Sequence, residues 1–307
     1  MSKTALLVRA HYMDEQVKAF VGGLSSDGSF DVFMLCDETR GPVETGDLPK
    51  ISISPQALRD LGLYDEVKNL LWRCGDYGLY VARRELPQYG AFWLVEPDVR
   101  LNDTPPWAIL ARFPGPEAAD FLAGWLRPAK PGWGWTRRMR AEEGPTWRCL
   151  FSMVRLSARA LDALAEARRA ASEDHRKHGR DPDAWPNDEV FVASTLMRQG
   201  FTCRDFNEFG QIYDEPGYGF WKPHTHGELE TEGRPGWIYH PVLGGARYFH
   251  KLSRWAVKRG QLDELESVVE RLVGVEWTEA QAAEHRGAFE ALRAEAAARG
   301  GGSGTGN

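Results

Sequence analysis

The segment AFWLVEPDVR, residues 91–100, joins an apolar run to two carboxylates. Residues 91–95 carry no charged side chain, and this predicts a strand that is buried on both faces. Strands of this kind belong to open α/β sheets, whose ligand sites lie beyond the carboxyl ends of the strands. Glu96 and Asp98 therefore lie where an α/β fold would place its chemistry.

The rest of the chain fits the same fold class. Apolar stretches predict strands at residues 4–9, 31–36, 91–95 and 146–155. Stretches of helical character lie between and after them, at residues 14–22, 76–84, 157–173 and 188–199. Ser157 and Asn187 precede two of these helices as N-cap residues. We expect an α/β fold with a mostly parallel central sheet and helices on both faces.

Composition narrows the function classes. The chain has 307 residues, 42% of them hydrophobic, and a net charge of −6. These values exclude a mostly disordered chain and argue against general nucleic-acid binding, which needs a basic excess. No apolar run is long enough to span a bilayer, no signal peptide is recognised, and the four cysteines form no CxxC pair. We expect a cytoplasmic protein without a transmembrane segment and without a nucleic-acid partner.

The two carboxylates predict a cation site. Glu96 and Asp98 are separated by one residue, so in a regular strand their side chains point to the same face. Mg²⁺ or Mn²⁺ binds one or two carboxylates and completes its shell with water and substrate phosphate. The alternative is an acidic strand end that is solvated or paired with Arg100.

A family resemblance starts from the same residues. A strand that ends in an acidic-x-Asp triplet resembles the DxD motif of GT-A nucleotide-sugar glycosyltransferases. The string WRCGDY at 72–77, followed by FWLVEPDVR at 92–100, resembles a group of largely uncharacterised bacterial members of that superfamily. The resemblance covers roughly residues 4–245. This chain departs from the motif in having Glu96 at its first position and Pro97 between the acids.

The resemblance implies a domain organisation and an activity. It implies a GT-A-like catalytic domain over residues 1–250, a helical extension over 251–299 and a disordered tail over 300–307. The implied enzyme is a metal-dependent, hexosyltransferase-like glycosyltransferase, as in polysaccharide biosynthesis. It would move a sugar from a nucleoside-diphosphate sugar, with a UDP-sugar favoured, to a hydroxyl of a glycan or glycoconjugate.

The resemblance also implies site residues. The metal, Mn²⁺ or Mg²⁺, would be held by Glu96, Asp98 and His240. The donor nucleotide would be held by Asp76, Arg9 and Trp72, and the general base would be Glu189 or Asp188. Each assignment has a simpler alternative: Asp76, Asp188 and Glu189 open helices, where acids favour the helix dipole or cap it, and lone histidines are often structural.

Two rival functions remain open. His224-Thr225-His226, with Glu230 behind it, is a plausible ligand set for Fe, Zn or Ni in a different metal enzyme. The second rival is a non-catalytic carbohydrate-binding protein of the same fold. The sequence contains no GxGxxG after the first strand, no P-loop and no HExxH motif.

The middle of the chain is rich in Trp, Pro, Gly and Arg. Five tryptophans lie in this region, at Trp107, Trp125, Trp133, Trp135 and Trp147. Flat aromatic faces in loops suit the apolar faces of sugar rings. The basic segment 127–148 could attract an acidic or phosphate-bearing acceptor. The alternative is a solvated loop neutralised by its own glutamates.

Overall fold

The computed structural model describes residues 3–300 except 27, 141–142, 260–266, 269, 271 and 274–276. The chain divides into two compact units. Unit 1 comprises Met1–Pro97 and Asp103–Ile212, and unit 2 comprises Asp98–Asn102 and Tyr213–Asn307. The catalytic-domain boundary at residue 250 stays a prediction. Residues 301–307 of the predicted tail lie outside the described residues, and Gly300 ends a helix.

Unit 1 is built on a seven-stranded sheet in the order β3-β2-β1-β4-β7-β6-β8. Its strands are β1 (Thr4–Ala10), β2 (Asp31–Asp37), β3 (Lys50–Ile53), β4 (Ala91–Val95), β6 (Phe121–Pro128), β7 (Trp147–Ser157) and β8 (Cys203–Asp205). The pairs β3–β2, β2–β1, β1–β4 and β6–β8 are parallel, whereas β7 runs antiparallel to both of its neighbours. The predicted mostly parallel α/β sheet is confirmed.

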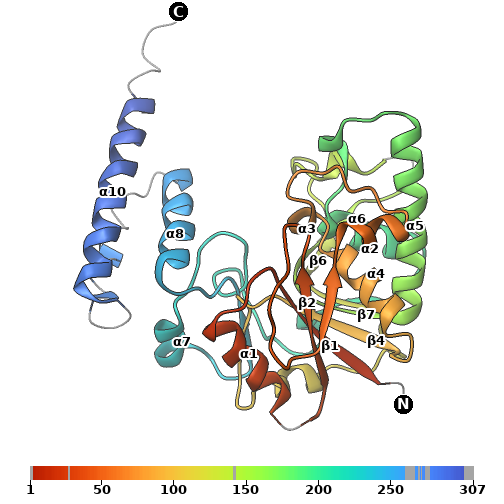
Figure 1. The fold of residues 1–307 in the computed structure, drawn as a ribbon, viewed down its shortest axis with the longest axis horizontal. Coiled ribbons are helices and arrows are strands. Elements are labelled where there is room, and N and C mark those ends of the chain that lie inside the picture. Colours follow the sequence, from red (N-terminus) through yellow and green to blue (C-terminus); the bar gives the residue numbers. More distant parts are fainter. Residues whose placement is uncertain are drawn as a thin grey trace, which may run out of the picture. The chain divides into compact units, whose positions relative to one another are not determined.

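Helices cover both faces of this sheet (Figure 1). They are α1 (Glu15–Ser25), α2 (Pro55–Asp60), α3 (Leu70–Arg73), α4 (Asp76–Glu85), α5 (Ala158–Lys177) and α6 (Asp188–Arg198). Figure 1 shows α1 on one side of the strands and α2, α4 and α5 on the other. Side chains alternate along β1, and both Leu6 and Leu7 are fully buried, so neither face is left to solvent.

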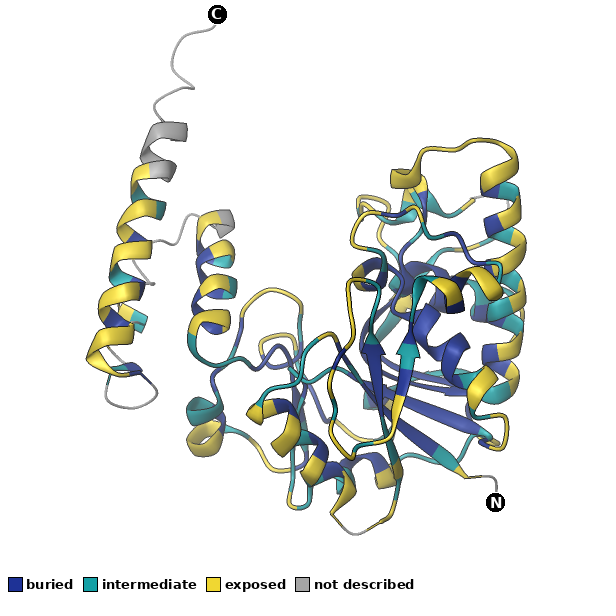
Figure 2. Ribbon diagram, viewed as in Figure 1, coloured by how far each residue is buried: buried dark blue, intermediate teal, exposed yellow. Residues whose placement is uncertain are grey.

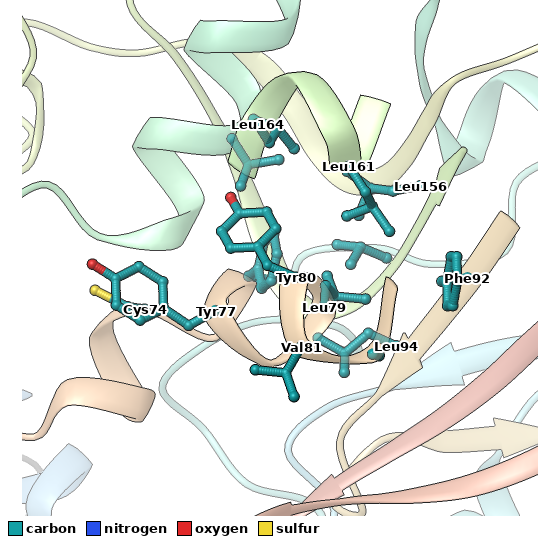
Figure 3. Close-up of a cluster of buried hydrophobic side chains, with 14 of the residues drawn as sticks. Cys74, Tyr77, Leu79, Tyr80, Val81, Phe92, Leu94, Leu156, Leu161 and Leu164 are labelled. Carbon is teal, nitrogen blue, oxygen red and sulfur yellow. The ribbon is translucent and has the colours of Figure 1, made fainter. Parts of the chain in front are cut away.

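The core of unit 1 centres on helix α4. Residues 76–82 of α4 are all buried, and Figure 2 shows most of this helix in dark blue. Its residues pack with Phe92 and Leu94 of β4 and with Leu161 and Leu164 of α5 (Figure 3). Gly78 allows α4 to lie close to β3, because a Cβ at this position would lie 2.7 Å from Cδ1 of Ile53. Burial of this apolar surface holds the carboxyl ends of β1 and β4 in fixed positions.

Two helix starts form as the sequence predicts. The Ser157 side chain accepts from Ala160 N at 3.2 Å, at the start of α5. The Asn187 side chain accepts from Val190 N at 3.2 Å, at the start of α6. Each cap satisfies a backbone donor that has no partner within the helix, so α6 begins at Asp188 and Glu189.

Unit 2 contains a small sheet and three named helices. Strand β5 (Arg100–Asn102) pairs antiparallel with β9 (Trp237–Tyr239). The helices are α7 (His226–Glu232), α8 (Gly245–Arg259) and α10 (Glu279–Gly300). Tyr248 and Leu252 of α8 are buried in a separate apolar cluster with Trp277 and Phe289. Helices α8 and α10 lie in the region of the expected helical extension, whereas residues 260–266, 269, 271 and 274–276 of that region lie outside the described residues. None of the described helices combines the length and apolarity needed to cross a membrane.

Candidate active site

The carboxyl ends of β1 and β4 lie side by side, because the two strands are parallel neighbours. β4 ends at Val95, two residues before Pro97, and Glu96 N still donates to Ser152 O of β7 at 2.8 Å. Arg9, near the end of β1, forms an ion pair with Glu96. The side chains of Arg9 and Glu96 are 12% and 24% exposed, so the pair lies at the surface end of the strands and is partly shielded from water.

Glu96, Asp98 and His240 form a cluster that could hold a metal ion. Each offers one ligand atom, and these atoms all lie within 4.8 Å of one another. In unit 2, His240 Nε2 lies 3.6 Å from Asp98 Oδ1. A backbone hydrogen bond also joins the two segments, because Val242 N, two residues after His240, donates to Asp98 O at 2.7 Å.

The orientation of the His240 ring favours metal binding. Its Nδ1 lies 2.6 Å from Gly219 O, and its backbone N donates to Gly217 O. A carbonyl only accepts, so we assign the ring proton to Nδ1. Nε2 then presents a lone pair on the side of Asp98, as a ligand histidine held by a backbone carbonyl does. Two carboxylates and one such imidazole fit Mn²⁺, and the oxygen ligands also fit Mg²⁺.

A second set of contacts connects the start of α4 with the start of α6. Gly75 N donates to Asp188 Oδ2 at 2.8 Å, and Asp188 Oδ1 accepts from Glu189 N at 2.7 Å. Arg9 Nη1 donates to Leu71 O at 3.3 Å. A Cβ at Gly75 would lie only 1.5 Å from Arg9 Nη1 and 2.8 Å from Asp188 Oδ2. The predicted residues Arg9 and Asp188 therefore meet at Gly75, where an added Cβ would have to displace the Arg9 guanidinium.

Trp72 lies one residue beyond the carbonyl that Arg9 contacts. Its side chain is 61% exposed, which is unusual for a residue of this size. The predicted contact of Trp72 with a nucleotide stays a prediction.

The two acids at the start of α6 have different surroundings. Asp188 is 4% exposed, and burial raises its pKa well above the ordinary value. Burial also raises the pKa of Glu189 to about 7, with a further raising effect from Glu96 and a lowering effect from Arg148. Glu189 is only partly buried. Glu189 is therefore the acid of the pair that has both access and a pKa suited to proton transfer near neutral pH.

Asp76 lies in the core of unit 1. It is 1% exposed, and its carboxylate accepts from Arg168 Nε at 2.7 Å and from Tyr80 Oη at 2.7 Å. Arg168 is also fully buried, and the adjacent Asp76 raises its pKa. In this structure the Asp76 carboxylate joins α4 to α5. Its contact with a nucleoside stays a prediction.

The Trp-rich region stacks its rings on arginines. Arg148 lies 5.6 Å from the Trp133 ring centre, and Arg138 lies 4.2 Å from that of Trp135. Arg148 also acts electrostatically on Glu189. In the sequence Arg148 is one of several basic residues of its segment, and nothing local singles it out for the site. Arg148 lies at the start of β7, which runs antiparallel to β4, so this end of β7 extends beyond the carboxyl end of β4. That position is the signal that could have found Arg148.

The rival histidine set does not assemble. His224, His226 and Glu230 all belong to the described part of the chain, and they form no metal-binding group there. His224 Nε2 lies 2.9 Å from Pro216 O, and His226 is the first residue of α7. The Thr225 side chain between them caps that helix. The segment thus builds a helix start.

Comparisons with known proteins give one kind of match. No family model and no curated protein matches the chain. Among solved structures, it is similar to the galactosyltransferase LgtC in complex with donor and acceptor sugar analogues. The similarity covers 75% of this chain and 78% of that one, with 9% identity and a TM-score of 0.38. Similarity at this level carries no argument about substrate or mechanism, so any function has to be argued from the residues themselves.

Proposed function

We propose that this chain is a GT-A-type glycosyltransferase that moves a sugar from a nucleoside-diphosphate sugar to a hydroxyl acceptor with the help of a divalent cation. The observation that carries the proposal is the Glu96–Asp98–His240 cluster at the end of an apolar strand in an α/β fold. A UDP-sugar is the favoured donor, and a glycan or glycoconjugate is the acceptor. Both follow from the sequence resemblance.

Glu96, Asp98 and His240 would hold Mn²⁺ or Mg²⁺. A cation bound there supplies positive charge to a departing diphosphate. Glu96 also contacts Arg9, so one carboxylate would face both the cation and a guanidinium. Arg9 would add a second positive charge toward the donor, and exposed Trp72 would offer a flat surface beside it.

Glu189 is the proposed general base in an inverting reaction. It would take the proton of the acceptor hydroxyl as that oxygen bonds to the anomeric carbon. The bond from the anomeric carbon to the diphosphate oxygen breaks, and the diphosphate leaves with the electron pair. Asp188, which binds Gly75 N and Glu189 N, would fix the start of α6 and so position Glu189. Asp188 remains the second candidate for the base.

Donor turnover tests the proposal. We expect the purified chain to hydrolyse a UDP-sugar slowly in the presence of Mn²⁺, and to transfer the sugar when a suitable glycan is present. Chelation should remove the activity. A panel of UDP-hexoses and UDP-N-acetylhexosamines, followed by NMR for released UDP, measures this even when the acceptor is not identified. Nucleotide binding with no turnover of any donor would instead favour a non-catalytic carbohydrate-binding protein.

A further inference from the structure

Unit 2 contains a cavity of about 540 Å³ that the proposed chemistry does not use. It is lined by the loop around Asp214, by α7 and by α8. Sites that take small organic ligands have volumes of roughly 300–1,000 Å³. The cavity is therefore large enough for a ligand of that kind.

The cavity walls combine aromatic rings with charged groups. Tyr239, Tyr248 and Trp255 supply the rings. The charged lining residues are Asp214, Lys222, Glu228, Glu232 and Arg234. Three of these are acids and two are bases, so the lining carries a net negative charge. That balance gives a phosphate or an acidic sugar no net attraction to the cavity as a whole.

Several of these groups are already held in place. Arg234 Nη1 lies 3.6 Å from Asp214 Oδ2, and Asp214 Oδ1 accepts from Gly217 N at 2.8 Å. Glu228 Oε2 accepts from Thr225 N at 3.0 Å in a capping box. Lys222 Nζ lies 5.4 Å from the centre of the Trp255 ring. The walls thus present fixed carboxylates, a lysine and rings in defined positions before any ligand binds.

The chemistry of the lining selects the ligand. Ionised carboxylates only accept hydrogen bonds, whereas the Lys222 ammonium and the Arg234 guanidinium only donate them, so the ligand has to bring both donors and acceptors. Aromatic rings need apolar faces to pack against. A neutral saccharide brings both, with hydroxyl groups around its edge and C–H groups on its faces. We infer that this cavity binds a neutral saccharide, as the site in unit 2 for part of the glycan acceptor. The choice of a saccharide rests on the proposed function.

Glu232 and Glu230 provide a matched pair for testing the site. Both are exposed residues of α7, but only Glu232 lines the cavity. We expect Glu232→Ala to weaken saccharide binding about tenfold, as the loss of a hydrogen bond to a charged group does. Glu230→Ala should leave binding unchanged. Trp255→Ala should weaken binding at least as much, and Trp255→Phe should restore most of it.

The experiment titrates the full chain with lactose, cellobiose and maltose, without nucleotide or metal, by calorimetry and saturation-transfer NMR. We expect saturable binding of at least one disaccharide, with the variant pattern given above. Three outcomes would overturn the inference: no binding of any of the three, equal effects of the two glutamate variants, or tighter binding of glucose 6-phosphate or spermidine. If Trp255→Ala does not fold, the glutamate pair decides alone.

This outcome is separable from that of the proposed function. Disaccharide binding without any metal-dependent nucleotide binding would remove the glycosyltransferase proposal and leave a saccharide site in unit 2. Metal-dependent nucleotide binding without disaccharide binding would remove only this inference.

Discussion

Asp76 and Arg168 form an ion pair that water does not reach: Arg168 Nε donates to Asp76 Oδ2 at 2.7 Å, and the two side chains are 1% and 0% exposed. Arg168 Nη2 adds a second bond to Asp76 Oδ1 at 3.2 Å. The pair connects α4 to α5. Breaking such a pair leaves one charge buried without its counter-charge, which is more costly than losing an exposed pair.

The first prediction concerns this pair. We expect Asp76→Asn to lower the free energy of unfolding by about 3–5 kcal/mol, because Arg168 stays charged in the core. Urea denaturation measures it. The matched control is Asp162→Asn, which breaks the exposed Arg83–Asp162 pair between the same two helices and should cost at most ~1 kcal/mol. Equal costs for the two variants would contradict the buried-pair account. Unchanged nucleotide affinity in folded Asp76→Asn would contradict a nucleoside contact.

The second prediction concerns Gly75. We expect Gly75→Ala to displace the Arg9 guanidinium, because the new Cβ would occupy its place. The chain should fold, since the end of an arginine side chain can move, but nucleotide affinity should fall. The control is Gly22→Ala in α1, where a Cβ meets nothing within 4 Å. Nucleotide titration of both variants measures the effect. If Gly75→Ala binds nucleotide as tightly as Gly22→Ala, Arg9 has no part in the donor site.

The third prediction concerns the rate of transfer. Since the Glu189 pKa is about 7, we expect the rate to rise with pH through that value and then to level off. Glu189→Gln should remove this rise and lower turnover by ~10²–10⁴, the usual loss for a general base. Transfer assays with a true acceptor across pH 5.5–8.5, at roughly one-unit steps around the expected pKa, measure both effects. Near-normal turnover in both Glu189→Gln and Asp188→Asn would exclude this base.

The fourth prediction concerns stability against pH. The folded-state pKa of Glu189 lies above its ordinary value of 4.5, so the folded chain binds the proton more tightly than the unfolded chain. Its stabilising effect is fully present below about 4.5 and is lost as pH rises through about 7. We expect a smaller decline in the free energy of unfolding over that window in Glu189→Gln than in the wild type. Identical slopes would contradict the raised pKa.

The sequence predicted the parts of the fold that have strong local signals. The strand at 91–95 has the predicted bounds, because its five apolar residues are followed by Glu96 and then by Pro97, which cannot donate to the ladder. The helices after Ser157 and Asn187 begin as predicted, because their caps are local. The short strand β3 and strand β6 were not predicted. Neither shows a clear alternation, and pairing with distant neighbours defines both of them.

Local sequence likewise accounts for only some of the contacts in the candidate site, because the others join residues that are far apart in the chain. Glu96 and Asp98 are separated by one residue in the sequence, so a strand end suffices to bring them together. The place of His240 beside Asp98 depends on bonds to Gly217 and Gly219, which no local pattern encodes. The ion pair of Asp76 with Arg168 joins residues 92 positions apart. A helix-start acid with a distant arginine partner looks the same in sequence as one that faces a ligand.

The central claim is that Glu96, Asp98 and His240 hold a cation that binds the donor diphosphate. Calorimetry of UDP binding with and without Mn²⁺ tests it most directly, on the wild type, on Asp98→Ala and on Asp103→Ala. Asp103 is a carboxylate close to Asp98 in the sequence that pairs with Arg112 and is not part of the cluster. We predict that Mn²⁺ tightens UDP binding in the wild type and in Asp103→Ala, and that Asp98→Ala abolishes this tightening. The claim would be contradicted if Mn²⁺ did not change the affinity of the wild type for UDP, or if Mn²⁺ raised the affinity of Asp98→Ala as much as that of the wild type.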